Sequence, residues 1–370
     1  CIRDRFINPA KVCKGMEMGD IPPSREILKT TLAVAWPSVL ESFFVNLAGM
    51  VDTIMVGTMG SYAIAAVGLT IQPKMLGLAL FLSLNVAVSA IVARRKGAGD
   101  RESANRVVRM CLLITLGMTA LTSALFVVFA GPIVRLVGSQ PDTHEYAVEY
   151  LQIIMGGQVF NTVSLVLNAA QRGAGNTRIA MVTNLISNVV NVIFNYLLIG
   201  GNLGFPELGV RGAAIATVLS QAVGAIWVIR FLTGPKTILK IRKEDMKLEG
   251  KIIMPVLALG ISTFVMLSTE SLLSISFSSS LARYGGDVAV GAMTVITSAS
   301  QLCTMPISGI CQGGQPVMSF NFGAGKKDRV KQAFRFQLTL CLGYTTIFWL
   351  LMMLVPGAVA GIFTSDASLI

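Results

Sequence analysis

The sequence has very little charge. Only 13% of its 370 residues are Asp, Glu, Lys or Arg, whereas a soluble globular domain carries about 25%. Its single histidine, His144, is too little for a His-based metal or catalytic site. The six cysteines form no CxxC pair, so they predict neither disulfides nor a metal centre. These shortages exclude an ordinary soluble protein and give no sign of an enzyme.

Long apolar blocks separated by short polar or basic loops make up most of the chain. Hydrophobic residues account for 53% of it, and the mean hydropathy is +0.69. A helix that spans a membrane needs about 20 mostly apolar residues. Nine blocks meet this requirement: residues 28–55, 63–92, 110–130, 146–170, 179–199, 213–232, 252–277, 288–320 and 333–355. The pattern predicts an all-α integral membrane protein with several spans.

The basic residues alternate along the chain in a way that orients these spans. Of the 30 lysines and arginines, 26 lie in the N-terminal tail or in the loop after every second span. Cytoplasmic loops of membrane proteins carry such an excess. We therefore expect a cytoplasmic N-terminus, and we attribute the net charge of +11 to topology and not to nucleic-acid binding.

The second half of the chain repeats the first. Residues 97–109 (GAGDRESANRVVR) match residues 323–335 (GAGKKDRVKQAFR) at a spacing of 226. Residues 60–66 match residues 286–292 at the same offset. The repeat unit holds six spans, so the two halves share one orientation and should be related by an axis along the membrane normal. The second copy stops after its third span, so we expect nine of twelve helices, in a fragment that lacks the last three.

This repeat divides the chain into four parts. The predicted parts are a cytoplasmic tail (1–26), a first six-helix bundle (27–233), a charged cytoplasmic linker (234–250) and an incomplete second bundle (251–370).

Three acidic residues fall deep within predicted spans: Glu41, Asp52 and Glu270. Ionisable groups in a bilayer are costly and usually functional, although an ion pair that only locks helices together is the alternative. Glu41 and Asp52 are 11 residues apart, which places them within about 20° of each other on a helix. A carboxylate held out of water can exchange a proton near neutral pH, or it can bind sodium with the help of amide oxygens.

The fifth predicted span supplies such amide oxygens. Asn184, Asn188, Asn191 and Asn195 form one stripe along a helix. The stripe predicts a polar cavity wall, and hydrogen bonding between helices is the alternative. Asn46 adds another amide in the first span. Lys74, the one basic residue inside a span, could pair with an acid, reach toward the membrane surface or bind an anionic group.

Several motifs resemble those of the multidrug and toxic compound extrusion (MATE) family. The resemblance lies in residues 36–40 (WPSVL), 50–57 (MVDTIMVG), 170–178 (AQRGAGNTR), 208–217 (LGVRGAAIAT) and 313–325 (GGQPVMSFNFGAG). The motifs occur in the family's order and cover the chain from about residue 27 to its end.

The resemblance implies a twelve-helix transporter that exports cationic, amphipathic drugs or toxic compounds in exchange for Na⁺ or H⁺. The family's first-helix aspartate falls on Asp52 and its seventh-helix glutamate on Glu270. Asn191 and Asn195 fall where one branch of the family has an Asn and an Asp, so the second acid of that branch is missing. Thr217 is a further expected member. The ion site would be at Asp52, Asn191 or Glu270, with Glu41, Asn46, Asn184 and Asn188 as further cavity residues.

Two other functions compete with drug export. A flippase for lipid-linked saccharides should line its cavity with Arg or Lys, whereas the predicted buried charges here are three acids and one lysine. A membrane enzyme should show a nucleophile, metal or paired-acid motif near the interface, and none is visible in the sequence. A scaffold has no need for buried carboxylates. We therefore expect a transporter that is not an enzyme, has no cofactor, binds no nucleic acid, and works as a monomer in a bacterial plasma (inner) membrane.

Overall fold

The computed structural model describes residues 24–137, 139, 141–234 and 250–355. Within these ranges the chain is helical and contains no β-strand. The elements are α3 (Ser24–Gly57), α4 (Ser61–Gly97), α5 (Arg101–Val128), α6 (Ala130–Leu136), α7 (Pro141–Gly156), α8 (Gln158–Gly173), α9 (Thr177–Ile199), the 3₁₀ turn η1 (Asn202–Gly204), α10 (Gly209–Thr233), α11 (Gly250–Gly323) and α12 (Lys327–Leu354). The predicted all-α class is confirmed.

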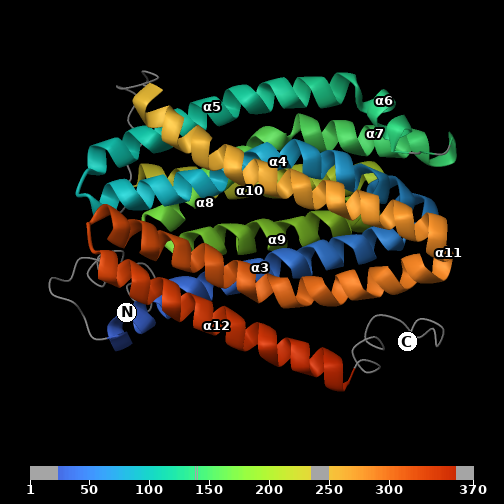
Figure 1. Ribbon diagram of the computed structural model, residues 1–370. Coiled ribbons are helices and arrows are strands. Elements are labelled where there is room, and N and C mark those ends of the chain that lie inside the picture. The colour runs from blue at the N-terminus through green and yellow to red at the C-terminus, as the bar shows by residue number, and fades with distance from the viewer. Residues whose placement is uncertain (1–23, 138, 140, 235–249, 356–370) are drawn as a thin grey trace.

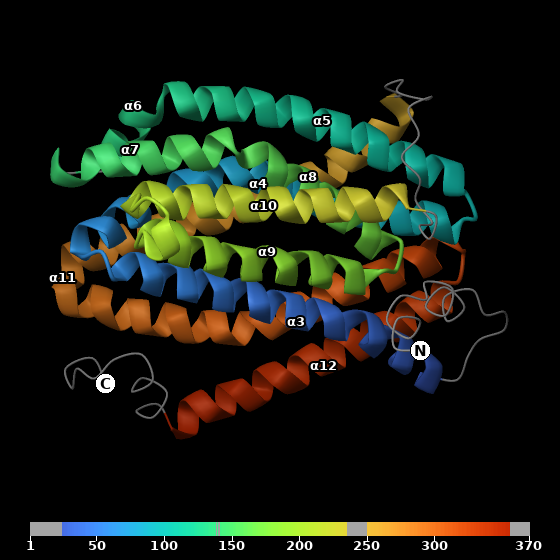
Figure 2. The ribbon, with the colours of Figure 1, turned by 180° about the vertical axis from the view of Figure 1, so that it is seen from behind.

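The long helices run side by side, and their connections lie at two opposite ends of the molecule (Figures 1 and 2). In the described part of the chain, six helices are long and apolar enough to cross a membrane. The pair α7–α8, which bends by 46° at its break, adds a seventh if it counts as one span. Large apolar side chains such as Trp36, Leu76 and Leu121 are exposed, as expected of surfaces that face lipid.

The predicted spans 252–277 and 288–320 both lie within α11. We predicted a loop between them, but the described chain is helical from Gly250 to Gly323. Figures 1 and 2 show that α11 nevertheless doubles back at one end of the molecule. The element therefore provides two antiparallel limbs, and it packs against α3 and α4.

Helices α4, α8 and α11 end in the same Gly-Ala-Gly sequence. The last glycine of each turn, Gly99, Gly175 or Gly325, has a left-handed φ of 79°, 86° or 74°. Such a φ suits glycine at a helix C-terminus because a Cβ would be strained there. The Nζ of Lys96 donates a buried hydrogen bond of 2.8 Å to the carbonyl of Ala174, which holds the first two turns together.

The ends of α4 and α11 approach each other reciprocally. A Cβ on Gly97 would collide with the backbone carbonyl of Phe320, and a Cβ on Gly323 would collide with that of Arg94. Both pairs of equivalent residues, 94 with 320 and 97 with 323, are separated by 226 positions. Two repeats related by a two-fold axis make contacts of this kind, so the arrangement supports the repeat predicted from the sequence.

Candidate functional site

A polar cavity lies between α3, α4, α8, α9, α10 and the second limb of α11. Its volume is about 740 Å³, which is within the range of sites for drug-sized molecules. Among the described residues, amides and hydroxyls dominate its wall, four side chains are charged and none is aromatic. The charged residues are Glu41, Asp52, Lys74 and Arg172.

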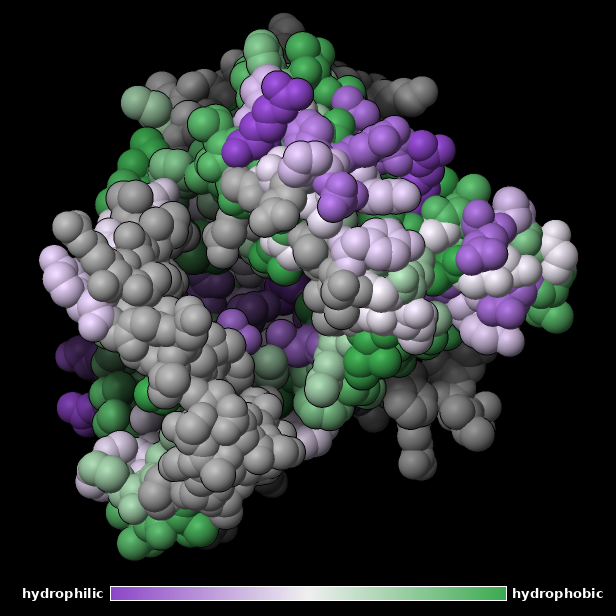
Figure 3. Space-filling model, turned by 90° about the vertical axis from the view of Figure 1, so that its right-hand side faces the viewer, coloured by the Kyte–Doolittle hydropathy of each residue, from purple (hydrophilic) through white to green (hydrophobic). Residues whose placement is uncertain are grey.

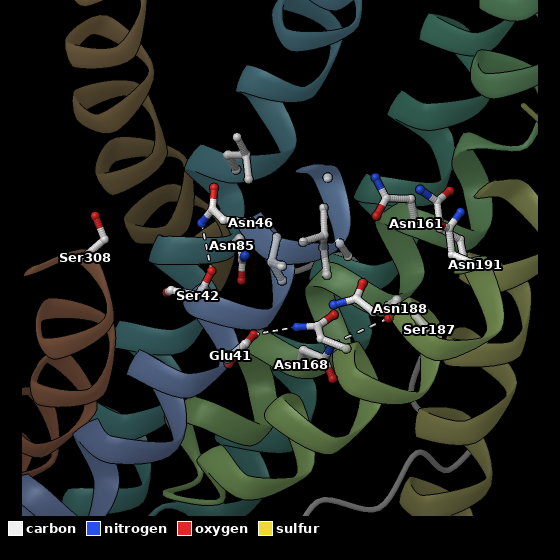
Figure 4. A pocket seen from close by; sticks show the side chains of 18 of the residues that line it. Glu41, Ser42, Asn46, Asn85, Asn161, Asn168, Ser187, Asn188, Asn191 and Ser308 are labelled. Atoms are coloured by element: carbon white, nitrogen blue, oxygen red, sulfur yellow. Dashed lines mark hydrogen bonds between the residues drawn. The ribbon is translucent and has the colours of Figure 1, made fainter. Parts of the chain in front are cut away.

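The interior of the molecule is visible from one end of the helices. From the end that carries α6 and the reversal of α11, hydrophilic residues lie at the floor of a hollow (Figure 3). Figure 4 shows amide side chains from α4, α8 and α9 arranged around the cavity, with Glu41 and Asn46 of α3 beside them. The wall is therefore built by helices that are far apart in the sequence, from α3 to α11.

Asp52 is joined to α9 by a short hydrogen bond. The Nδ2 of Asn195 donates to its Oδ1 at 2.6 Å, and the same amide donates to Oδ1 of Asn191 at 3.2 Å. Asn191 in turn donates to the hydroxyl of Thr217 on α10 at 3.3 Å. The structure thus brings together four of the predicted site residues in one hydrogen-bonded chain.

This group also contains a free acceptor. The Oδ1 of Asn195 is buried without a hydrogen-bond partner in the described structure, and the residue is 0% exposed. An unpaired buried acceptor is costly, and carboxylate and amide oxygens are the ligands that hard cations prefer. The residues at Asp52 therefore fit either a small cation or a proton that Asp52 would share with its neighbours.

Glu41 lies in a second polar group, near the other end of the cavity. Its Oε1 forms an ion pair with Nη1 of Arg172 at 2.8 Å, and both side chains are less than 10% exposed. Asn184 donates to the same Oε1 at 2.6 Å, and Nη2 of Arg172 donates to Oδ1 of Asn85 at 3.1 Å. The group connects α3, α4, α8 and α9.

Arg172 follows the end of the fourth predicted span, at residue 170, and so counts among the 26 basic residues expected in the tail and cytoplasmic loops. This expectation is wrong, because Arg172 occupies the last turn of α8 and is buried. Because α8 continues to Gly173, the side chain can reach back into the bundle. The signal that could have revealed it was the buried carboxylate of Glu41, which needed a partner of opposite charge.

The asparagine stripe on α9 faces both the cavity and the neighbouring helices. Asn184, Asn188 and Asn191 line the cavity, and they also hydrogen-bond neighbouring helices. Asn188, for example, donates to the backbone carbonyl of Phe44 at 3.1 Å. Asn46 lines the cavity too and donates to the carbonyl of Ser42 at 2.8 Å.

Lys74 faces the same cavity from α4. Its side chain is half-buried, and within the described structure it forms no hydrogen bond and no ion pair within 4 Å. It does interact electrostatically with Asp52. The sequence left three options for Lys74: pairing with an acid, reaching toward the membrane surface, or binding an anionic group. Its position on the cavity wall favours the first and the third.

Glu270 is not part of either group. It lies on α11 with an exposed side chain, and it does not line the cavity described above. Among the described residues there is also no cluster of three or more His, Cys, Asp or Glu side chains that could hold a metal ion.

Comparison with known proteins gives a consistent result. A family model described as MatE matches residues 37–197 and 262–370. A protein of Thermotoga maritima named "Probable multidrug resistance protein NorM" is 28% identical over 93% of this chain and 74% of its own length. A protein of Shewanella oneidensis named "FAD transporter" is 24% identical over 93% of this chain and 76% of its own length.

Solved structures share the fold. One described as an outward-facing multidrug resistance MATE family transporter of the MOP superfamily superimposes with a TM-score of 0.87 at 24% identity. It covers 97% of this chain and 77% of its own. A MOP superfamily transporter from Pyrococcus furiosus, described as having a binding pocket of reverse polarity, gives a TM-score of 0.87 with the same two coverages.

Proposed function

The chain belongs to the MatE family of multidrug efflux transporters, and on this premise we propose that it exports organic cations in exchange for Na⁺ or H⁺ bound at Asp52. It is a membrane transporter and not an enzyme. The observation that carries the proposal is the hydrogen-bonded chain from Asp52 through Asn195 and Asn191 to Thr217, on the wall of a cavity large enough for a drug.

Electrostatics gives a physical reason for exchange. Glu41 and Arg172 neutralise each other as an ion pair, which leaves Asp52 and Lys74 as the opposite charges that face the cavity. A cation or proton on Asp52 removes its negative charge and leaves Lys74 uncompensated. The cavity then repels an organic cation, and by linkage the organic cation weakens binding of the coupling ion to the same extent.

The group around Asp52 has one carboxylate where one branch of the family has two. Asn195 stands where one branch of the family has an aspartate, so Asp52 is the carboxylate that changes charge in this group. Asn191, Asn195 and Thr217 would orient it and supply oxygens to a bound ion. Glu270 remains a second proposed coupling residue, carried by the family resemblance alone.

The basic loops support a proposal for the orientation of the protein in the membrane. The α4–α5, α8–α9 and α11–α12 connections lie at the end of the molecule opposite α6 (Figures 1 and 2). We propose that this basic end is cytoplasmic, as the positive-inside rule requires. The hollow in Figure 3 would then open to the exterior, in an outward-facing state ready to release substrate.

A transport experiment tests the proposal. The full-length gene, as wild type and as Asp52→Asn, would be expressed in cells that lack their own efflux pumps, and accumulation of a fluorescent cationic dye would be measured with the sodium or the proton gradient collapsed. We expect lower dye in the wild type, loss of this effect in Asp52→Asn, and dependence on one of the two gradients. Asp142→Asn makes the same chemical change at an exposed residue of α7 and should export normally. Equal dye in all properly inserted variants would refute the proposal.

A further inference from the structure

The cavity is more polar and less acidic than a site that served lipophilic monocations alone would need to be. Cationic aromatic drugs are held by aromatic faces and net negative charge, but the described lining contains no Phe, Tyr or Trp. Its formal charge is balanced, with two acids and two bases. Asn, Gln, Ser and Thr supply 17 of its 27 lining residues, so the site is built to form hydrogen bonds to a polar ligand.

Of the four charged side chains in the described cavity lining, Lys74 is the one that makes no hydrogen bond to protein. The other base, Arg172, is bonded to Glu41 and Asn85. An ammonium group has three donors, yet within the described structure Lys74 makes no hydrogen bond to protein. A half-buried cation with free donors is suited to bind an anionic group of a ligand.

Lys74 also lies well inside α4 and not at its end. It is the fourteenth residue of α4, which runs from Ser61 to Gly97. A rise of about 1.5 Å per residue places it about 20 Å from the nearer end of the helix. Its side chain lines the cavity, as does that of Asp52.

We propose that Lys74 is a specificity-determining residue, and that this transporter selects zwitterionic organic molecules whose carboxylate binds Lys74 while their amine binds Asp52. The inference rests on the proposed function and adds a carboxylate to its substrates, so that the ammonium group bound by Asp52 belongs to a zwitterion. A ligand with both charges satisfies Asp52 and Lys74 at once, whereas a simple cation satisfies Asp52 and leaves Lys74 repelling it. The balanced charge of the cavity would then discriminate zwitterions from simple cations.

Two probes that differ in one carboxylate test this inference. Nε-dansyl-lysine carries an amine and a carboxylate, and dansyl-cadaverine carries the same amine on the same chain without the carboxylate. Binding of each to the purified full-length protein would be measured by fluorescence titration, for wild type, Lys74→Gln and Lys74→Arg. Lys331→Gln, on the exposed surface of α12, is the matched control.

We expect the wild type and Lys331→Gln to prefer Nε-dansyl-lysine by about tenfold, as a charge-assisted hydrogen bond provides. Lys74→Gln should lose this preference by binding the zwitterion more weakly, without weaker binding of dansyl-cadaverine. Lys74→Arg should keep most of it because the charge is retained, which also separates loss of charge from loss of folding. Equal affinity of the wild type for both probes, or an equal loss for both in Lys74→Gln, would overturn the inference.

Transport of the same probes into proteoliposomes separates the inference from the proposed function. If the wild type moves dansyl-cadaverine in a gradient-dependent manner that Asp52→Asn abolishes, but shows no preference for the zwitterion, antiport stands and the role of Lys74 is wrong. If the wild type binds and moves neither probe, both are wrong.

Discussion

The carboxylate of Glu41 and the guanidinium of Arg172 form a buried ion pair 131 residues apart in the sequence, with 2.8 Å between Oε1 and Nη1. The pair joins α3 to α8, and Asn184 and Asn85 each bond one of its two members. Both charges therefore have specific partners, although Oε2 of Glu41 is buried without one in the described structure. Removing either member leaves the other buried and uncompensated, which is far more costly than removal of an exposed pair.

We expect Arg172→Gln to lower the stability of the protein strongly, by about 3–5 kcal/mol, and Glu41→Gln to do so to a similar extent. The double variant should be more stable than either single variant, because no isolated charge remains. The thermal unfolding temperature in detergent would be the measurement. Glu102→Gln breaks the exposed pair with Arg106 and should cost less than about 1 kcal/mol. Additive losses in the double variant would contradict the prediction.

Asn195 should control cation binding more than stability. Its Nδ2 bonds Asp52, and its free Oδ1 is buried beside that carboxylate. We expect Asn195→Ala to weaken the stabilisation that the coupling cation provides, raising the cation concentration for half effect by about tenfold, as loss of one ligand or one hydrogen bond to a charge does. Thermal unfolding at increasing Na⁺ concentration, and separately at decreasing pH, would measure this.

Asn202→Ala is the matched control for that experiment. Asn202 bonds the carbonyl of Tyr196 outside the cavity, so its loss should leave the cation dependence unchanged. The same cation response in Asn195→Ala and the wild type would refute the role of Asn195.

Patterns along the chain predicted the architecture well and the pairing of side chains poorly. The offset of 226 predicted which helix ends are equivalent, and the asparagine spacing predicted one polar face on α9, of which Asn184, Asn188 and Asn191 line the cavity. Periodicity could not reveal that Arg172 points into the bundle. The sequence pattern at a helix end does not distinguish a basic residue that faces solvent from one that pairs with a buried acid. Nor could periodicity show that α11 stays helical between the two predicted spans, because Gly285 and Gly286 disfavour the interior of a helix.

The reciprocal crossing of α4 and α11 makes a prediction about two glycines. A methyl group on Gly97 or on Gly323 would meet a backbone carbonyl, which cannot rotate away as a flexible side chain can. We expect Gly97→Ala and Gly323→Ala each to destabilise the protein by about 1–3 kcal/mol, as overpacking does. Their effects should be similar because the two sites are equivalent.

Gly117→Ala is the control, since Gly117 is within α5 and has nothing within 4 Å of an added Cβ. That substitution should be neutral or should stabilise the helix by up to about 1 kcal/mol. Stability measured by unfolding in mild detergent would compare the three variants. A tolerated Gly97→Ala with a strongly destabilising Gly323→Ala would contradict the reciprocal contact.

The positions of Asp52 and Glu270 predict that the two acids are not interchangeable. Asp52 lies on the cavity wall within a hydrogen-bonded chain, whereas Glu270 is exposed on α11 and outside that cavity. If the cavity group carries coupling, Glu270→Gln should keep most of the gradient-dependent export, and Asp52→Asn should lose at least nine-tenths of it, roughly the loss that removal of one essential charged contact causes. Dye efflux from cells and ²²Na⁺ binding to purified protein would be measured for both variants. Loss of export and of ion binding in Glu270→Gln, with Asp52→Asn retaining both, would place coupling on α11, because an acid that contributes nothing to ion binding cannot link the ion to the substrate.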